Sequence, residues 1–276
     1  MANKSETLSS CNTKRGLRVG HLNIYHLSNK IADVCALLQN CETVHLLGIS
    51  KTRLDHRFSD ADIEIPNYTI ERHDAKLTGE TGLAVYIHNS ITPYVYRRRD
   101  LEPENVESLW LEIKDSKSKP LFVGIAYRNP SITFAWYDEF VNMMDIINRN
   151  NESNILLLCD FNLDLFKAQP SWASTISFLG LNQLVTQPTR VTKSTSTLLD
   201  HIYTNNSDLV GDIDVPLVSV SDHHPIFCPW STRLPKSPAK DHTTIRYRSF
   251  KHFNRDALFS DLNSAHSGRP SPKLAL

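Results

Sequence analysis

The chain has 276 residues, 40% hydrophobic and 22% charged, which is long enough to bury a sizeable core. Lys+Arg and Asp+Glu both number 30, so the chain lacks the bulk positive field that would by itself indicate nucleic-acid binding. Five cysteines form no C-x-x-C pair and no apolar run approaches the ~18 residues of a membrane span, so we expect an intracellular, soluble protein with reduced thiols and no membrane partner.

Strand-like and helix-like segments alternate in the first half of the chain. Residues 1–16 are polar and are expected to form a loose leader. Apolar residues recur at helical spacing from Leu27 to Leu38, and Ser28 or Asn29 can cap this helix. Short apolar runs predict strands at 17–24, 44–49, 68–71, 83–87, 109–113 and 121–127.

The second half continues the alternation. One apolar face, running from Tyr137 to Ile147, predicts a helix, and Trp172, Ile176 and Leu179 predict a shorter one that Gly180 ends. The expected strands are 154–159, 201–204, 213–220 and 226–228.

The strand content decides the fold class. About ten strands with three or four helices are too many for a simple doubly wound sheet, so we predict an α/β fold in which two mixed sheets pack face to face with helices outside. After Pro229 the composition becomes rich in Pro, Lys, Ser and Thr, with a weak helical pattern from Phe250 to Leu262. We therefore predict a domain at 17–229, followed by a linker and partial helical tail at 230–276.

Polar side chains follow several of the expected strands. Asp160 and Asn162 come after the most apolar strand; if the chain stays extended they share one side, with Phe161 facing inward. A carboxylate can accept a proton from water and an amide can donate to a phosphate oxygen. The same Asp-x-Asn pattern is also typical of a turn.

Three further positions carry similar chemistry. Asp222 beside His223 supplies a metal ligand and a group that can hydrogen-bond developing charge, although a tight turn or helix N-cap would use the same residues. Asp200 can orient an imidazole from elsewhere in the chain. Asn23 can ligate a hard cation or simply turn the chain.

The basic runs 97–99 and 246–251 are candidate nucleic-acid contacts or solvated surface charge.

Taken in order, these segments resemble the endonuclease/exonuclease/phosphatase superfamily, and within it the endonuclease domains of non-LTR (LINE-like) retrotransposons. Motifs for serine hydrolases, nucleoside triphosphatases, dinucleotide-binding proteins and zinc proteases are absent. The resemblance covers residues 17–229, and its segments are 21–24, 49–55, 82–87, 107–110, 126–130, 159–164, 187–190, 197–203 and 221–225.

The resemblance implies a four-layered α/β sandwich with one site at the strand ends, Mg²⁺ as cofactor and double-stranded DNA as substrate. Asn23 and Asp222 would then sit at the metal, and Asp160 would position and deprotonate the attacking water. Asn162 and Tyr127 would hold the phosphate. His223, oriented by Asp200, would stabilise the charge that develops on it.

Two positions depart from the family pattern. Lys51 stands where the family has a metal-binding glutamate, and Cys159 replaces a glycine in a packed strand. A divalent ion and a unit charge about 4 Å apart interact by roughly 8 kcal/mol at an effective dielectric near 20, so Lys51 turns a large attraction into repulsion. We therefore expect weakened Mg²⁺ binding and impaired DNA nicking.

Two other functions remain open at this stage. The chain could be a catalytically dead remnant that at most binds nucleic acid, or it could act on a phosphorylated small molecule or an RNA end. The tail around Arg246 and Phe253 is similar to the segment that precedes the reverse transcriptase in such elements, which implies that polymerase as a partner in a longer form. A nuclear destination follows only from the supposed DNA substrate.

Overall fold

The computed structural model describes residues 16–40, 43–75, 80–114, 119–131, 134–148, 153–232, 255–257 and 259–260. The chain divides into two compact units, residues 1–237 and 238–276. In the second unit the described residues are helical. Residues 1–15 of the leader predicted at 1–16, and most of the predicted tail, lie outside the described residues, so the domain boundaries at 16/17 and 229/230 stay predictions. No helix in the described ranges has the length and apolar character needed to cross a membrane.

The first sheet has five strands in the order β13–β1–β2–β4–β3. Strands β1 and β2 run parallel and the remaining neighbours are antiparallel, so the sheet is mixed. Its strands are β1 (Leu17–Asn23), β2 (Leu46–Ser50), β3 (Tyr68–His73), β4 (Leu83–His88) and β13 (Ile226–Trp230).

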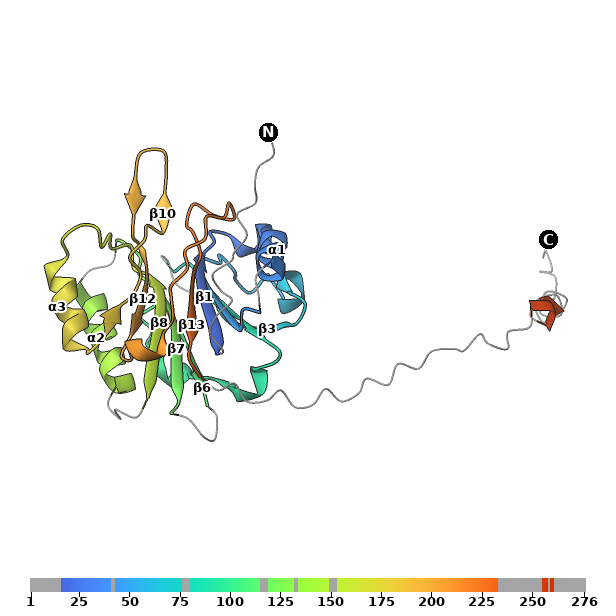
Figure 1. Cartoon of the computed structure of the whole chain (residues 1–276), viewed down its shortest axis with the longest axis horizontal. Helices are drawn as coiled ribbons and strands as arrows, with labels where there is room; N and C mark the ends of the chain where they lie inside the picture. The colour runs from blue at the N-terminus through green and yellow to red at the C-terminus, as the bar shows by residue number, and fades with distance from the viewer. Residues whose placement is uncertain are drawn as a thin grey trace, which may run out of the picture. The chain divides into compact units, whose positions relative to one another are not determined.

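The second sheet has six strands in the order β5–β6–β7–β8–β12–β9, with β7 and β8 parallel. A separate two-stranded hairpin, β10 with β11, projects beyond the sheets (Figure 1). The strands are β5 (Val95–Arg97), β6 (Ser108–Ile113), β7 (Leu121–Tyr127), β8 (Asn154–Asp160), β9 (Asn182–Gln183), β10 (Arg190–Val191), β11 (Ser196–Thr197) and β12 (Asp200–Thr204).

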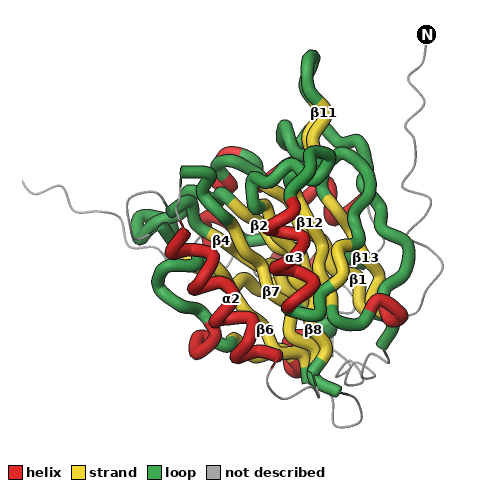
Figure 2. Tube along the Cα trace, turned by 90° about the vertical axis from the view of Figure 1, so that its left-hand side faces the viewer, coloured by secondary structure: helices red, strands yellow, loops and turns green. Residues whose placement is uncertain are grey.

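Helices cover the outer face of each sheet. Helix α1 (Ile31–Asn40) packs on the first sheet, whereas α2 (Phe134–Asn148) and α3 (Pro170–Phe178) lie across the second (Figure 1; Figure 2). Short 3₁₀ helices cover Leu27–Asn29, Asp60–Ile63, Thr92–Tyr94, Arg99–Leu101 and Ser207–Leu209.

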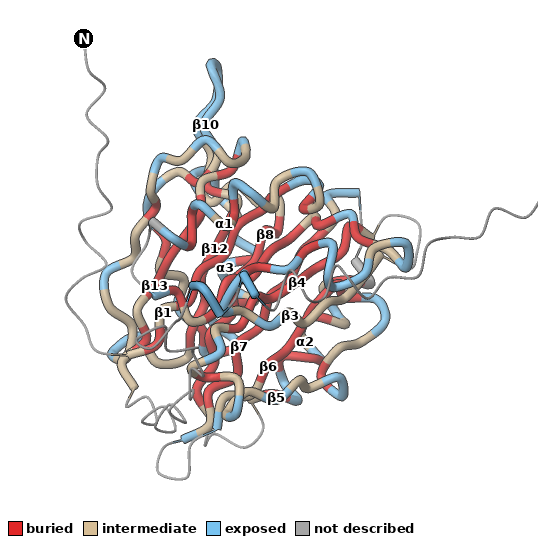
Figure 3. Tube along the Cα trace, turned by 90° about the vertical axis from the view of Figure 1, so that its right-hand side faces the viewer, coloured by how far each residue is buried: buried red, intermediate tan, exposed pale blue. Residues whose placement is uncertain are grey.

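Three apolar cores hold these four layers together. One lies between the two sheets, one between the first sheet and α1, and one between the second sheet and α2 with α3. The central strands are therefore buried on both faces, which is why they read as continuous apolar runs (Figure 3). Even Trp110, on the opposite face of β6 from Leu109 and Leu111, is fully buried. The predicted four-layered α/β sandwich is confirmed.

A glycine in β2 allows close packing between the two sheets. A Cβ atom built on Gly48, in the middle of β2, would collide with the side chain of Ile125 in β7. The absence of a side chain at Gly48 thus lets Ile125 fill the space between the sheets. This contact packs β2 of the first sheet directly on β7 of the second, and polar residues stand at the ends of both strands.

The predicted strand at 213–220 is wrong. In this stretch only Asp214 forms an isolated bridge, to Phe227 of β13. Pro216 lacks the backbone N–H that a ladder requires, and Leu217 is exposed, so the run does not pair as a strand. The apolar side chains of this stretch nevertheless contribute to the core. Val215 is buried, and Val218 and Val220 pack against the core under α1.

Candidate active site

Polar residues at the ends of central strands meet at one end of the two sheets. In the second sheet, Tyr127, Asp160 and Asp200 are direct neighbours across β7, β8 and β12. In the first sheet, Asn23 ends β1 beside Ser50 of β2. Asn23 Nδ2 donates to Asp160 Oδ2 at 2.6 Å, so a buried hydrogen bond joins the two sheets at this point.

The backbone is strained around these strand ends. Six described non-glycine residues have positive φ angles, and five of them lie within three residues of the end of β1, β2 or β8. Each such conformation costs about 1–3 kcal/mol and persists only where the surroundings impose it, which is typical of functional sites. The five residues are Tyr25 (φ 51°), His26 (72°), Lys51 (55°), Arg53 (57°) and Asn162 (51°).

The strained conformation of Asn162 changes the geometry expected after β8. The chain does not stay extended past Asp160, because the Asn162 N–H turns back to donate to Asp160 Oδ1 at 2.9 Å. The Asn162 side chain donates to the Arg128 carbonyl at 2.8 Å. Phe161 between them is fully buried, as predicted. Asn162 therefore reaches the site through a turn.

Asp200 and His223 form a buried pair. His223 Nδ1 lies 2.7 Å from Asp200 Oδ2, and its Nε2 lies 3.4 Å from Asn23 Nδ2. The imidazole that Asp200 could orient is therefore that of His223. Ligand atoms of Asp160, Asp200 and His223 all lie within 4.8 Å of one another, and such a cluster could hold a metal ion.

Burial and mutual charge set the protonation of this cluster. Burial, reinforced by the Asp200 carboxylate, raises the pKa of Asp160, although His223 and Lys51 oppose the shift. Burial would also raise the pKa of Asp200, but the attraction of His223 outweighs it and lowers that pKa. Burial alone would lower the pKa of His223, but the facing Asp200 carboxylate raises it. Both shifts stabilise the charged forms of Asp200 and His223 through their mutual attraction.

Lys51 points into the cluster and away from solvent. Its Nζ lies 3.5 Å from Asp160 Oδ2 and 5.0 Å from the centre of the Tyr127 ring, and its side chain is 17% exposed. The Asp160 and Asp200 carboxylates suit a hard cation. A divalent ion about 4 Å from the ammonium would nevertheless meet roughly 8 kcal/mol of repulsion at an effective dielectric near 20. With Lys51 in this position, the site does not fit Mg²⁺.

A cavity of about 500 Å³ opens beside the cluster. Asp160 is fully buried and does not line it, whereas its two partners Asn23 and Lys51 do. Water in the cavity can reach the Asp160 carboxylate only if one of these partners moves. The lining residues are Asn23, Tyr25, Lys51, Asn162, Arg190, Leu199, Asp222 and His223, while Tyr127 and Asp200 lie behind them with Asp160.

Asp222 reaches the cavity but is outside the buried cluster. Its side chain is 54% exposed, and its Oδ2 accepts a hydrogen bond from Arg190 Nε at 2.9 Å. Partial burial would raise the pKa of Asp222, but the bond from Arg190 outweighs it and lowers that pKa. The predicted role of Asp222 at a metal stays a prediction, since a salt bridge already engages its carboxylate.

His21 and Arg190 are part of the site but received no role from the sequence. His21 Nδ1 lies 3.6 Å from Asp200 Oδ1, and neither ring nitrogen has a hydrogen-bond partner among the described residues. Burial lowers the pKa of His21 to about 4, so its ring is neutral. A histidine inside an apolar strand looks like a core residue. The resemblance already included both positions, and this was the signal that could have identified them.

Behind the site, a hydrogen-bonded chain supports the turn that carries Asn162. Trp172 Nε1 donates to the Tyr203 hydroxyl at 2.8 Å, and that hydroxyl lies 3.0 Å from His201 Nδ1. His201 Nε2 then donates to the carbonyl of Leu163 at 3.0 Å. This arrangement requires a neutral imidazole protonated on Nε2. Burial lowers the pKa of His201 to about 4, in agreement.

The His201 chain predicts a loss of stability in acid. The unfolded chain protonates His201 below a pKa of 6.5, whereas the folded chain resists down to about 4, so stability falls as the pH falls between these values. Between pH 7 and pH 5, His201→Gln is expected to lose about 2 kcal/mol less unfolding free energy than the wild type. Urea unfolding at both pH values measures this. His56→Gln, at an exposed position, should follow the wild type, and an unchanged pH dependence in His201→Gln would contradict the assignment.

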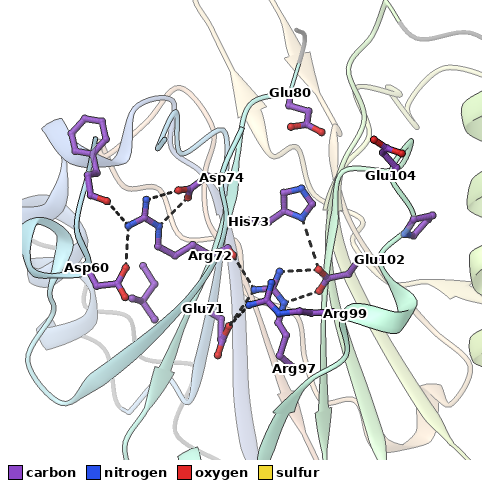
Figure 4. Close-up of a pocket in the computed structure, with 13 residues that line it drawn as sticks. Asp60, Glu71, Arg72, His73, Asp74, Glu80, Arg97, Arg99, Glu102 and Glu104 are labelled. Atoms are coloured by element: carbon purple, nitrogen blue, oxygen red, sulfur yellow. Dashed lines mark hydrogen bonds and ion pairs between the residues drawn. The ribbon is translucent and has the colours of Figure 1, made fainter. Parts of the chain in front are cut away.

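A second cavity, of about 830 Å³, shares no lining residue with the first. Arg97 and Arg99 of the basic run 97–99 line it. Arg97 Nε donates to Glu102 at 2.7 Å and Arg97 Nη1 to Glu71 at 3.2 Å (Figure 4). Arg98 pairs with Asp100 and Glu112, and Arg99 lies 4.0 Å from Glu71. Acidic partners thus neutralise this run, which favours the structural alternative over a nucleic-acid contact. The run 246–251 lies outside the described residues.

Cys159 does not disturb the packing of β8. It is fully buried in the core beneath α2 and α3, with its Sγ 3.8 Å from the His201 carbonyl. Burial raises the pKa of its thiol, so Cys159 is an inert core residue.

Comparison with known proteins gives matches at the level of the fold. No protein-family model matches the sequence, and no curated protein is similar to it. Among solved structures, the chain is similar to the endonuclease domain of TRAS1, a telomere-specific non-LTR retrotransposon, with 14% identity, 79% of this chain and 99% of that chain covered, and a TM-score of 0.59.

Two further structures show the same fold. The AP endonuclease LMAP from Leishmania major has 13% identity, covers 79% of this chain and 88% of its own, and gives a TM-score of 0.66. An endonuclease/exonuclease/phosphatase family protein from Leptotrichia buccalis has 14% identity, covers 78% and 100%, and gives a TM-score of 0.55. This chain therefore has the fold of endonuclease/exonuclease/phosphatase proteins.

Proposed function

We propose that this chain is a DNA endonuclease domain of the retrotransposon type, in which phosphodiester cleavage is weakened. The observation that carries the proposal is the cluster of Asp160, Asp200 and His223 within 4.8 Å, at the edge of a cavity large enough for a backbone phosphate. The fold and the likeness to the TRAS1 endonuclease domain support it. A reverse transcriptase domain in a longer form and a nuclear location belong to the same proposal.

The proposed reaction is an in-line attack of water on the phosphorus. Asp160 takes the proton of the water as the new O–P bond forms, and its raised pKa suits it to this role. His223, held by Asp200 at 2.7 Å, donates to the oxygen that gains charge as the old P–O bond breaks. Asn162, which lines the cavity, holds the phosphate oxygens, a role that the resemblance also implies for Tyr127 behind it.

Lys51 is the reason we propose weak cleavage. Its ammonium neutralises the Asp160 carboxylate and, together with Asn23, separates it from the cavity, so water reaches the base only after one of these two side chains moves. The same charge repels the Mg²⁺ that would neutralise the phosphate. Both effects reduce the rate of hydrolysis and leave the binding of a phosphate unimpaired.

The experiment is the nicking of supercoiled plasmid in the presence of Mg²⁺. We expect slow nicking by the wild type and none by Asp160→Ala. Asp208→Ala, which removes an exposed carboxylate away from the cluster, should nick like the wild type. Equal residual rates in Asp160→Ala and the wild type would show that any nicking comes from a contaminant and would leave the proposal without support.

A second candidate function is DNA binding without cleavage. The burial of Asp160 behind Lys51 and Asn23 favours it, since a carboxylate that water does not reach is no base. A wild-type chain that binds a DNA duplex but never nicks plasmid, even after Lys51 is replaced, would identify this function.

A further inference from the structure

The first cavity is lined by a cationic side chain, that of Lys51. We infer that it takes up a backbone phosphate of DNA without any divalent ion, with the ammonium of Lys51 supplying the positive charge. This inference rests on the proposed function and narrows it, because it assigns phosphate binding to Lys51 and Arg190 and separates binding from cleavage.

The backbone fixes the position of Lys51. The Lys51 carbonyl accepts a hydrogen bond from the His26 N–H at 3.0 Å, and the next residue, Thr52, donates to the Gly82 carbonyl at 3.1 Å. Loops after β1 and before β4 thus hold both sides of the residue in a left-handed conformation, φ 55°. With the Lys51 backbone held in this way, the side chain extends to the face of the Tyr127 ring. Its ammonium then lies between Asp160 and the cavity.

The charges that face the cavity favour an anion. Lys51 and Arg190 line it as cations, and Asp222 is the one carboxylate among its lining residues. The other two carboxylates, Asp160 and Asp200, are fully buried behind the lining. Two cationic side chains and one carboxylate thus line the cavity, so its wall is net positive and attracts a phosphate, whereas it repels a divalent cation.

Both cations keep hydrogen-bond donors free for a phosphate. An ammonium has three N–H donors, and Lys51 directs one toward Asp160. Arg190 uses its Nε for Asp222, and its terminal amino groups form no hydrogen bond with other described residues. A planar guanidinium and a point-like ammonium are the usual partners of phosphate oxygens in proteins, and this cavity is lined by one of each.

The test is the binding of a short fluorescein-labelled DNA duplex without terminal phosphates, followed by fluorescence anisotropy in EDTA and in Mg²⁺. The wild type is expected to bind equally well in both. Lys51→Gln should weaken binding about tenfold in both and reduce the slope of log affinity against log salt by about 1. Lys51→Glu should bind more weakly still in EDTA and recover when Mg²⁺ is added.

Two further variants make the result specific. Lys167→Gln removes a lysine that is 75% exposed and paired with Asp164 at 3.5 Å, and it should bind like the wild type. Arg190→Gln, at the rim, should weaken binding as Lys51→Gln does and serves as the second readout if Lys51 variants unfold. Wild-type binding that disappears in EDTA, or equal affinities for Lys51→Gln and Lys167→Gln, would overturn the inference.

The outcome is separable from that of the proposed function. If no variant nicks plasmid but Lys51→Gln loses affinity for the duplex in EDTA, the phosphate site stands and the nuclease proposal fails. If the wild type nicks plasmid and binds the duplex only with Mg²⁺, the nuclease proposal stands and the inference fails.

Discussion

Lys51→Glu is expected to raise Mg²⁺-dependent nicking of supercoiled plasmid by at least about a hundredfold, which corresponds to about 2.7 kcal/mol. This is about a third of the roughly 8 kcal/mol by which a divalent ion and a unit charge about 4 Å apart interact at an effective dielectric near 20. The substitution removes the ammonium that lies 3.5 Å from Asp160 and places a carboxylate where a divalent cation can use it. The rate of nicked-circle formation at fixed Mg²⁺, compared between the variant and the wild type, measures the effect.

Two controls separate charge from ligation. Lys51→Gln removes the repulsion without adding a ligand, so its rate should fall between those of the wild type and Lys51→Glu. Adding Asp160→Ala to Lys51→Glu should abolish nicking, because the base is then absent. Equal rates for Lys51→Glu and the wild type would show that Lys51 is not what limits cleavage.

The expected gain in cleavage goes with a loss in metal-free binding. In the wild type, the Lys51 ammonium lies 3.5 Å from the Asp160 carboxylate and separates it from the cavity. In the proposed function, the same side chain both supplies the positive charge for phosphate and neutralises the base. In Lys51→Glu, a bound Mg²⁺ must supply the positive charge that Lys51 supplies in the wild type. Unlike the lysine side chain, Mg²⁺ can dissociate, so it does not permanently cover the Asp160 carboxylate. Cleavage and metal-free binding should therefore move in opposite directions at position 51.

Much of the fold could be predicted from the sequence because its central strands are buried on both faces. Strands such as β7 and β8 are continuous apolar runs, and the apolar face of α2 recurs with helical period. The strand-end positions of Asn23, Asp160 and Asp200 followed from the same reading. Parallel neighbours such as β7 and β8 end at the same edge of a sheet, so residues at those ends become neighbours.

The sequence did not predict how these strand ends turn or where their side chains point. The left-handed conformation of Lys51 is imposed by hydrogen bonds from other loops, and no local propensity indicates it. The left-handed conformation of Asn162 agrees instead with the turn that the Asp-x-Asn pattern allowed. A lysine can extend to solvent as easily as inward, so only the three-dimensional surroundings show that the Lys51 ammonium lies at Asp160. Strands of two residues, such as β9, β10 and β11, are too short to carry a period.

Phe161→Ala is expected to reduce the free energy of unfolding by about 3–5 kcal/mol, the range for a fully buried aromatic side chain. The Phe161 ring is 5.2 Å from Trp136, 5.4 Å from Phe140 and 5.4 Å from Trp172, measured between ring centres. It thus joins α2 and α3 to the end of β8, and alanine would leave a cavity at that junction. Urea unfolding followed by circular dichroism measures the loss.

The same residue connects the core to the chemistry, because Phe161 lies between Asp160 and Asn162 and its carbonyl accepts a hydrogen bond from Arg128 Nε at 2.7 Å. Phe161→Leu, which fills part of the space, should cost less than Phe161→Ala. Phe178→Ala, at a position that is 81% exposed on α3, should change stability by less than about 0.5 kcal/mol. A loss in Phe161→Ala no larger than in Phe178→Ala would mean that the aromatic cluster does not hold the strand end, and the rigid turn that presents Asn162 to the cavity would need another cause.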